Sequence, residues 1–576
     1  DQLSLASSAE LVQSILQGGE VMPEVRELIL TRATGNPLFM EEFTHTLLEN
    51  GSIQKKDHEY VLSRKASDIQ VPDTIQGIIA ARMDRLEESL KRTMQVASVI
   101  GRDFAFRVLQ TITGMREELK SYLLDLQGLE FIYEKRLFPE LEYIFKNALT
   151  QEVAYNSLLL KRRKEIHEKI GKAIEELYPD RLEEFYEMLA HHYSRSENLE
   201  KAYQYLLLSA MKVGFNYSLW EAFRFGKEAI NVLNQMPQTE ENKRRGIDTR
   251  LLVGLVMRGL GYPEDSLEVL QEGERLSKEL GDERSLVNYY SSIAICYAFK
   301  GDLPQGRKYA EKAFQGAEKM GDIELLAPIG VDLCQAYSLA GEFSRTAEVA
   351  PQVIASLEKT QREAEFFGRP HNLYSALLAA YGCALGYLGD FEAGEALCDK
   401  GLRVALEINN LVSIAVAEAS YTALFCAKGD GRNTVEHGQN ALRCAEEMQA
   451  VTFMAPAWLL LGWGYYFLGE LERAIECSQK GLGMQRAAGF SLHLPSFYLC
   501  IGYCHLDSGD LAKARSCFEE ALELSQKSSQ RHQEGQSRYL LGRVLGKMGP
   551  SQYGKAEEYV LQGMGIYDEL KLRPYC

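Results

Sequence analysis

The residues best spaced to bind a metal ion are Cys500, Cys504 and His505. The two cysteines lie one helical turn apart, so both thiols would face the same side of a helix. A zinc site usually combines two such pairs, and no second pair with suitable spacing lies nearby. His191 and His192 are adjacent, and neighbouring side chains on a helix point about 100° apart, so they cannot chelate one ion together. We therefore predict no metal site and interpret these residues as packing or surface side chains.

Nucleotide chemistry requires a phosphate-binding loop of the form G-x-x-x-x-G-K-[ST]. Three Gly-Lys pairs occur, and each lacks the following Ser or Thr: Gly171-Lys172-Ala173, Gly226-Lys227-Glu228 and Gly546-Lys547-Met548. No nucleophile–base constellation and no acidic pair suited to a cyclase is apparent either. We therefore predict that this chain has no catalytic residues and holds no cofactor by itself.

Charge and composition restrict the partners. The 576 residues carry 64 basic and 81 acidic side chains, a formal net charge of −17. Such a surface repels phosphate backbones, so we expect no nucleic-acid partner. No stretch approaches about 18 uninterrupted apolar residues, so we expect no membrane partner either. The odd number of cysteines, 11, fits a reducing, cytoplasmic location.

A constant period dominates the second half of the sequence. Turn glycines recur there, and the steps between them are 40, 40, 48, 40, 40, 40 and 40: Gly261, Gly301, Gly341, Gly389, Gly429, Gly469, Gly509 and Gly549. A second set of turn residues falls halfway between them: Gly281, Gly321, Asn409 and Gly489. The segments between turns have helical apolar spacing, and a residue that accepts the left-handed conformation ends each one. Each unit is therefore predicted to be two antiparallel helices of about 16 residues.

The positions inside each unit identify the repeat type. A large apolar residue followed by a small one precedes the turn, as in Leu461-Gly462, and a bulky residue such as Tyr465 stands four before it. A small residue follows the turn, as at Ala474. This is the tetratricopeptide pattern in a longer form, which we favour over HEAT-like repeats of similar length. The predicted fold is all-α, an αα-hairpin superhelix of about nine to ten repeats over residues 181–576.

The first helices of such hairpins line a concave groove. Positions one and four after the small residue would face it, which in the late repeats are Trp463, Tyr466, Tyr503 and Leu506. An aromatic, weakly charged groove suits a protein or peptide partner. The alternative is that these side chains pack against the neighbouring repeat.

Residues before about 180 lack the register of the repeats. Within residues 1–70, the corner Gly35-Asn36-Pro37 separates a helix near residues 24–31 from one that continues to Leu48, and alone it reads as an ordinary helical corner. Residues 71–180 begin with a helical stretch after Val71-Pro72. Three more helical segments follow, near 89–100, 104–111 and 116–126, and then two β-like runs, 131–135 and 140–145. Three helices followed by a β-ribbon predict a winged helix.

The order GNPLFMEE, VPDTIQGIIAARMDRL, VIGRDF and YIFKNALTQEVAYNSLLLKRRKEIHEKI resembles the C-terminal part of bacterial STAND-type signalling ATPases. The resemblance implies a helical lid remnant over residues 1–70, a winged helix over 71–180 and the repeat sensor. It also implies that Gly35, Asn36 and Pro37 lie against an adenine nucleotide, ATP or ADP with Mg, in a longer parent protein. The similar proteins carry class III adenylate or guanylate cyclase domains or Ser/Thr kinase domains, so the phosphate-binding loop and the output domain are expected outside this chain.

A winged-helix transcription regulator with a repeat sensor is the alternative function. The candidate recognition helix, residues 116–125, carries two basic and three acidic side chains. A helix that reads a DNA groove needs a basic surface, so we favour the signalling interpretation.

Overall fold

The chain forms two compact units. The computed structural model describes residues 2–17, 19–69, 71–137, 140–216, 218–489 and 492–572. The first unit comprises residues 1–216 and 227–236, and the second comprises residues 217–226 and 237–576, so helix α12 (Leu219–Gln235) has residues in both. The boundary predicted at residue 180 therefore falls inside the first unit.

The segment before the winged helix combines helices with a small sheet. The helices are α1 (Leu5–Ile15), α2 (Pro23–Ala33) and α3 (Pro37–Glu49), followed by the 3-10 turn η1 (Ala66–Asp68). The strands are β1 (Glu20–Val21), β2 (Ile53–Lys56) and β3 (Glu59–Leu62), in the order β1-β3-β2, with β1 parallel and β2 antiparallel to β3. The expectation of a purely helical segment was wrong here. Strands this short, with a single buried residue in β2, show no alternation that sequence reasoning can detect.

The described residues between 75 and 145 form four helices and a three-stranded sheet. The elements are α4 (Ile75–Met83), α5 (Glu88–Ile100), β4 (Asp103–Ala105), α6 (Phe106–Thr113), α7 (Glu118–Gly128), β5 (Ile132–Arg136) and β6 (Glu142–Phe145). Strands β4 and β5 pair antiparallel with the central β6. Sequence reasoning assigned Phe104 to a helix, whereas it lies in β4, where its ring packs against Tyr143 and Phe145. Phe138 and Pro139, predicted between the last two strands, lie outside the described residues.

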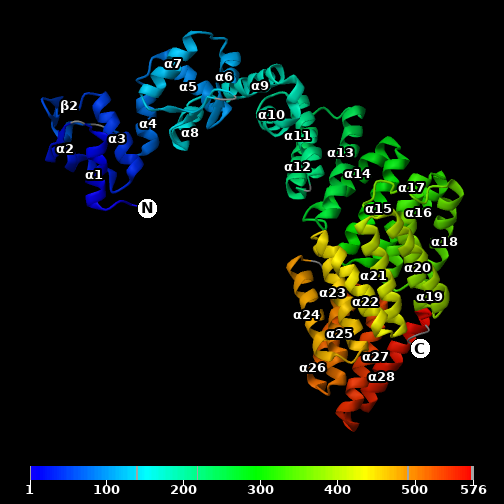
Figure 1. Cartoon of the computed structure of the whole chain (residues 1–576). Coiled ribbons are helices and arrows are strands. Elements are labelled where there is room, and N and C mark those ends of the chain that lie inside the picture. Colours follow the sequence, from blue (N-terminus) through cyan, green and yellow to red (C-terminus); the bar gives the residue numbers. More distant parts are fainter. Residues whose placement is uncertain are drawn as a thin grey trace. The chain divides into compact units, whose positions relative to one another are not determined.

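Helices complete the first unit, and the elements described in the second unit are also helices (Figure 1). In the first unit these are α8 (Ala148–Asn156), α9 (Leu160–Leu177), η2 (Pro179–Phe185), α10 (Tyr186–Tyr193) and α11 (Leu199–Phe215). In the second unit the described residues form eight consecutive pairs: α13 (Glu240–Gly259) with α14 (Ser266–Leu280), α15 (Glu283–Phe299) with α16 (Leu303–Met320), α17 (Ile323–Ala340) with α18 (Phe343–Thr360), α19 (Leu373–Tyr387) with α20 (Phe391–Ile408), α21 (Leu411–Lys428) with α22 (Gly431–Glu447), α23 (Val451–Phe467) with α24 (Leu471–Ala487), α25 (Leu494–Asp507) with α26 (Leu511–Lys527), and α27 (Arg531–Met548) with α28 (Tyr553–Leu570), the last pair joined by η3 (Pro550–Gln552). Successive first helices contact each other along the array. The predicted αα-hairpin superhelix is confirmed.

The turns between these helices contain a residue with positive φ at nearly every twentieth position. All of the glycines predicted as turn residues have φ between +63° and +130°, and Asn409 has φ +55°. Gln361, Gln449 and Ser529 adopt the same conformation, with φ between +52° and +54°, although no glycine marks them. The left-handed residue ends one helix and lets the chain turn back for the next, so its spacing fixes the length of every helix.

Small residues opposite rings determine how closely the helices pack. A Cβ atom added to Gly481 of α24 would lie 2.6 Å from the Phe497 ring of α25, and one added to Gly502 of α25 would lie 2.5 Å from the Phe518 ring of α26. Both rings are fully buried. The predicted pairing of a small residue with a bulky one is therefore what brings neighbouring helices into contact.

The last pair of helices also contacts repeats that are distant in sequence. His532 of α27 meets Phe343 and Tyr387 edge-on, and these two rings stack on each other with centroids 4.1 Å apart. Leu570 of α28 is buried in the same cluster. Repeat arrays normally contact only their sequence neighbours, so this cluster is a local contact between two distant parts of the array.

Two helices, α17 and α21, are long and apolar enough to cross a membrane by length and composition. Each is the first helix of its pair, and both contribute residues to the array's core, including Leu333 of α17 and Leu424 of α21.

We predict that Gly481→Ala destabilises the repeat array by about 1–3 kcal/mol, because the new methyl group overlaps the Phe497 ring in a fully packed core. Gly483 provides a matched control on the same helix, since a Cβ there meets nothing within 4 Å. Gly483→Ala should be stabilising by up to about 1 kcal/mol through helix propensity. Thermal unfolding followed by circular dichroism measures both. Equal effects of the two substitutions would contradict the packing described here.

Candidate functional site

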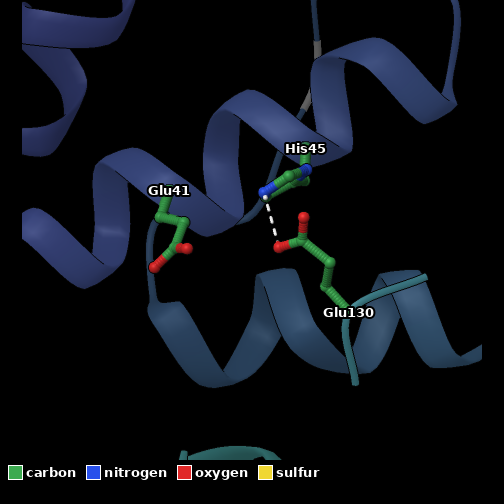
Figure 2. Close-up of side chains that lie close together, drawn as sticks. All are labelled: Glu41, His45 and Glu130. Atoms are coloured by element: carbon green, nitrogen blue, oxygen red, sulfur yellow. Dashed lines mark ion pairs between the residues drawn. The ribbon is translucent and has the colours of Figure 1, made fainter. Parts of the chain in front are cut away.

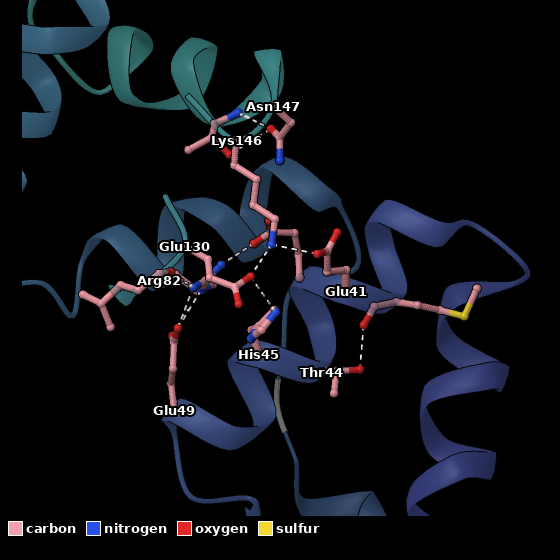
Figure 3. A network of polar contacts seen from close by, with 12 residues as sticks. Glu41, Thr44, His45, Glu49, Arg82, Glu130, Lys146 and Asn147 are labelled. Carbon is pink, nitrogen blue, oxygen red and sulfur yellow. Dashed lines mark hydrogen bonds and ion pairs between the residues drawn. The ribbon is translucent and has the colours of Figure 1, made fainter. Parts of the chain in front are cut away.

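A buried arginine connects the N-terminal helices to the winged helix. Arg82 of α4 is 2% exposed, and its guanidinium donates to Glu42 Oε2 at 2.5 Å and to Glu49 Oε1 at 2.6 and 2.9 Å (Figure 3). It also donates to the carbonyl oxygen of Leu129 at 2.9 Å and lies 4.6 Å from the centre of the Phe131 ring. Burial alone would lower the pKa of Arg82, but the hydrogen bonds and charges of Glu49 and Glu42 outweigh it, so the pKa is raised.

A second cation extends this arrangement. Lys146, just before α8, donates to Glu41 at 2.7 Å and to Glu130 at 2.6 Å, and His45 Nε2 lies 3.4 Å from Glu130 (Figure 3). The hydrogen bond from Lys146 lowers the pKa of the Glu130 carboxyl, although burial opposes it. Burial lowers the pKa of His45. We call the residues around Arg82 and Lys146 the charge network. It holds α3 against α4, the end of α7 and the start of α8.

Glu41, His45 and Glu130 are grouped closely enough to be considered as metal ligands (Figure 2). Glu41 and His45 lie one turn apart on α3, and Glu130 approaches from the end of α7. The ammonium group of Lys146, however, already lies between the two carboxylates. A metal ion would have to displace a cation with two charge-assisted hydrogen bonds, so we interpret the group as part of the charge network.

Sequence reasoning did not identify the charge network. The available signal was the spacing on one helix, because Glu41, His45 and Glu49 follow each other at intervals of four. Their partners come from positions 82, 130 and 146, and only the fold brings these together.

The corner singled out from the sequence lies between α2 and α3. Gly35 has φ +81°, Asn36 caps α3 by accepting from the Phe39 amide at 3.2 Å, and Pro37 begins the helix. The Leu3 amide donates to the Gly35 carbonyl at 2.8 Å, so the chain near residue 3 covers this glycine. Asn36 and Pro37 are exposed. A cavity of about 610 Å³ lies along α2 and residues 62–66, and the three corner residues are not among those that line it.

The structure brings three of the four predicted groove residues together. Trp463, Tyr466 and Tyr503 are half-buried, with ring centroids 5.3–5.9 Å apart, and the Tyr466 hydroxyl donates to Asp507 at 2.8 Å. Leu506 was wrongly predicted to line the groove. It is 1% exposed and packs with Phe518 and other core residues, because it faces the second helix of its own pair.

Cys500 and Cys504, the pair considered for a metal, are both buried. Burial raises the pKa of the Cys500 thiol, a direction that disfavours the thiolate a metal requires.

A histidine cluster lies in the first unit. His167 Nδ1 of α9 is 2.9 Å from His192 Nδ1 of α10, and the Tyr155 hydroxyl lies 3.2 Å from His167 Nε2. His191 is exposed, as the sequence allowed, but its ring contacts His192. Burial lowers the pKa of His167 to about 3 and lowers that of His192 well below its usual value, with the charge of Arg195 acting in the same direction. Both rings are therefore neutral at pH 7.

These features define a class, a tetratricopeptide-repeat protein whose repeats follow a smaller region of mixed helices and strands. The family model of the tetratricopeptide repeat matches residues 455–487 and 494–569. A search of curated proteins finds no match.

Three solved structures are similar along the chain. The first is a Signal Transduction ATPase with Numerous Domains (STAND) protein with a tetratricopeptide repeat sensor, PH0952 from Pyrococcus horikoshii, with 15% identity and a TM-score of 0.44 over 99% of this chain and 74% of that one. A Rap protein complexed with Competence and Sporulation Factor has 15% identity and a TM-score of 0.48 over 64% and 98% of the two chains. The Rap conjugation gene regulator of the plasmid pLS20, in complex with the Phr* peptide, has 12% identity and a TM-score of 0.37 over 57% and 93%.

We predict that Arg82→Met costs about 3–5 kcal/mol of stability in the first unit, because it leaves the buried Glu42 without its cation. Arg85→Met, an exposed position on the same segment, should change stability little. Adding Glu42→Leu to Arg82→Met should restore part of the loss, since the uncompensated charge is removed as well. Thermal unfolding with hydrogen exchange of α3 measures these effects. If Arg82→Met behaved like Arg85→Met, the charge network would not hold α3 in place.

We predict that acid destabilises the first unit through His167 and His192. Their folded pKa values are lowered, so the stability they contribute is complete above their ordinary pKa of 6.5 and is lost as pH falls toward the folded values. Each neutral ring makes the unfolding free energy fall by up to about 1.4 kcal/mol per pH unit below 6.5. Hydrogen exchange of α9 and α10 between pH 7 and pH 5 measures this slope.

The double variant His167→Gln with His192→Gln should flatten the slope while keeping polar groups in place. His58→Gln, at an exposed turn, should leave it unchanged. Identical slopes in the double variant and the wild type would show that these two rings do not carry the pH dependence.

Proposed function

We propose that this chain is the regulatory region of a STAND-type, ATP-dependent signalling protein. The order of its parts supports this proposal: a helical corner at residues 35–37, then a winged helix, then a long tetratricopeptide array. The charge network would couple these parts mechanically. Because Arg82 and Lys146 join α3 to both ends of the winged-helix region, a displacement of the corner is transmitted to the winged helix.

In this proposal the repeat array binds a partner protein or peptide. The cluster of Trp463, Tyr466 and Tyr503 supports it, because half-exposed aromatic side chains are the residues that contribute most binding energy at protein interfaces. All three come from first helices of successive pairs, which form the inner face of such arrays.

The nucleotide would act on the other end of the sequence. ADP would hold the corner and winged helix in a closed arrangement, and partner binding with ATP and Mg would shift the population toward an open one. The exposed Asn36 and Pro37 could then contact adenine. The phosphate-binding loop and the output domain, an adenylate or guanylate cyclase or a Ser/Thr kinase, would belong to the longer cytoplasmic protein, and this chain itself would be non-catalytic.

The transcription-regulator alternative has less support. Helix α7 begins with Glu118 and also carries Asp125, and its last turn contains no basic residue. A helix of this charge lacks the footprint that phosphate backbones require.

We predict that ADP with Mg slows amide hydrogen exchange at Gly35 and Asn36 in the longest product of the encoding gene, relative to ATP with Mg. Pro37→Ala should weaken this protection, because the rigid apolar ring is lost while the helix start tolerates alanine. Pro550→Ala, another proline at a helix start, should leave it unchanged. Amide exchange at Gly35 and Asn36 that is the same with ADP, ATP and no nucleotide would contradict the proposed switch.

A further inference from the structure

One spacing in the repeat array breaks its period. The step from Gly341 to Gly389 is 48 where the other steps are 40, and the additional chain lies in residues 361–372, between α18 and α19. Asn372, fully buried, fixes this loop by donating to the carbonyl oxygens of Glu363 at 2.7 Å and Glu365 at 3.3 Å. The loop therefore has a defined conformation that is fixed by hydrogen bonds.

Arg369 of this loop forms an ion pair with the buried carboxylate of Asp332. Arg369 donates to Asp332 Oδ2 at 2.6 Å, and Arg258 donates to Asp332 Oδ1 at 3.1 Å. Ser291 donates to the same carboxylate at 2.7 Å. Arg258, Ser291 and Asp332 come from α13, α15 and α17, three successive first helices, so the cluster lies on their shared face.

The charges of this cluster do not balance. Asp332 has a side chain only 3% exposed, and it is shared by two guanidinium groups, which leaves one positive charge in excess. Arg258 and Arg369 are 29% and 15% exposed and each makes one hydrogen bond to a described residue, so further N–H donors remain. His371 adds no further positive charge, because burial and the charge of Arg258 lower its pKa to about 4 and its ring is neutral at pH 7.

A tyrosine provides an independent indication. Tyr262 is 5% exposed and adopts φ +59°, an unusual conformation for a bulky residue. Its hydroxyl makes no hydrogen bond within the described part of the chain, although it is close enough to Arg258 and Asp332 for their charges to act on it. The hydroxyl keeps contact with solvent, so its O–H can donate to a ligand.

We infer that Arg258, Arg369 and Tyr262 form a binding site for a carboxylate group of a peptide ligand. The ligand carboxylate would accept hydrogen bonds from the free guanidinium N–H groups and from the Tyr262 hydroxyl, while Asp332 and Ser291 hold the two arginines in position. An anion fits here because it neutralises the excess charge in a partly desolvated place, where charge-assisted hydrogen bonds are strong. The inference rests on the proposed peptide-binding function of the repeats and assigns the chemistry that the ligand must carry.

The test uses the full chain and three pools of random heptapeptides. One pool has free C-termini, the second is C-terminally amidated, and the third is amidated and lacks Asp and Glu. Peptides retained on the immobilised protein are quantified by mass spectrometry. The wild type should retain carboxylate-bearing peptides at least about tenfold over the third pool, the size expected for hydrogen bonds to charged groups. The comparison of the first two pools tells whether the α-carboxylate or an acidic side chain is bound.

Arg369→Met should abolish this preference, and Arg369→Lys should retain part of it because the charge is kept. Arg345→Met, an exposed arginine on α18, is the matched control and should retain the preference fully. Thermal unfolding verifies that each variant is folded. If the wild type retained all three pools equally, or if Arg369→Met kept the preference, the carboxylate site would be refuted while peptide binding by the repeats would stand. If no pool were retained, both would be refuted.

Discussion

The repeat array depends on a backbone constraint, a residue in the left-handed region at nearly every twentieth position. Each such residue ends a helix at the same length, so that successive helices present the same faces to each other. Glycine meets this requirement at most turns without steric cost. At Gln361, Gln449 and Ser529 the packing of adjacent helices imposes the same conformation on residues that do not favour it. The period is thus a property of the packing as well as of the sequence.

In the N-terminal unit, ion pairs connect helices that are distant in sequence. Helix α3 meets α4 and the end of α7 through charged side chains, of which Arg82 and Glu42 are fully buried, and Arg82 and Lys146 are each shared between two carboxylates. Buried ion pairs add little net stability, but removing one partner is costly, so they specify one arrangement strongly. A movement of α3 would therefore be expected to move α4 and the end of α7 with it.

Two features of the repeat array come from segments far apart in the chain. The stacked Phe343 and Tyr387 contact His532 of the last pair of helices. The long loop between α18 and α19 brings Arg369 to Asp332, beside Arg258 from α13. Both features are exceptions to the rule that repeats contact only their neighbours. Such exceptions give one part of a regular array a surface that the other repeats lack.

Much of the fold could be predicted because its signals are local. The glycine period gave the helix pairs, and the small residues opposite rings, such as Gly481 and Phe497, gave their packing. The positions of α4 to α7, β5 and β6 were also predicted, whereas β4 was not. Strands β1 to β3 were missed because strands this short carry too little alternation to detect. Leu506 was wrongly predicted to face the groove, because residue spacing along a helix predicts the direction of a side chain only approximately.

The amino-acid sequence by itself determined the length of the helices, the repeat register and the composition of the core, since these follow from turn chemistry and from periodicity within a single repeat. Tertiary structure alone decided which charges meet. Glu42 and Arg82 lie on different helices, Arg258 and Arg369 belong to different repeats, and no local pattern relates the members of either pair. Their pairing arises because burial makes an uncompensated charge costly, and that cost exists only once the fold has removed the water.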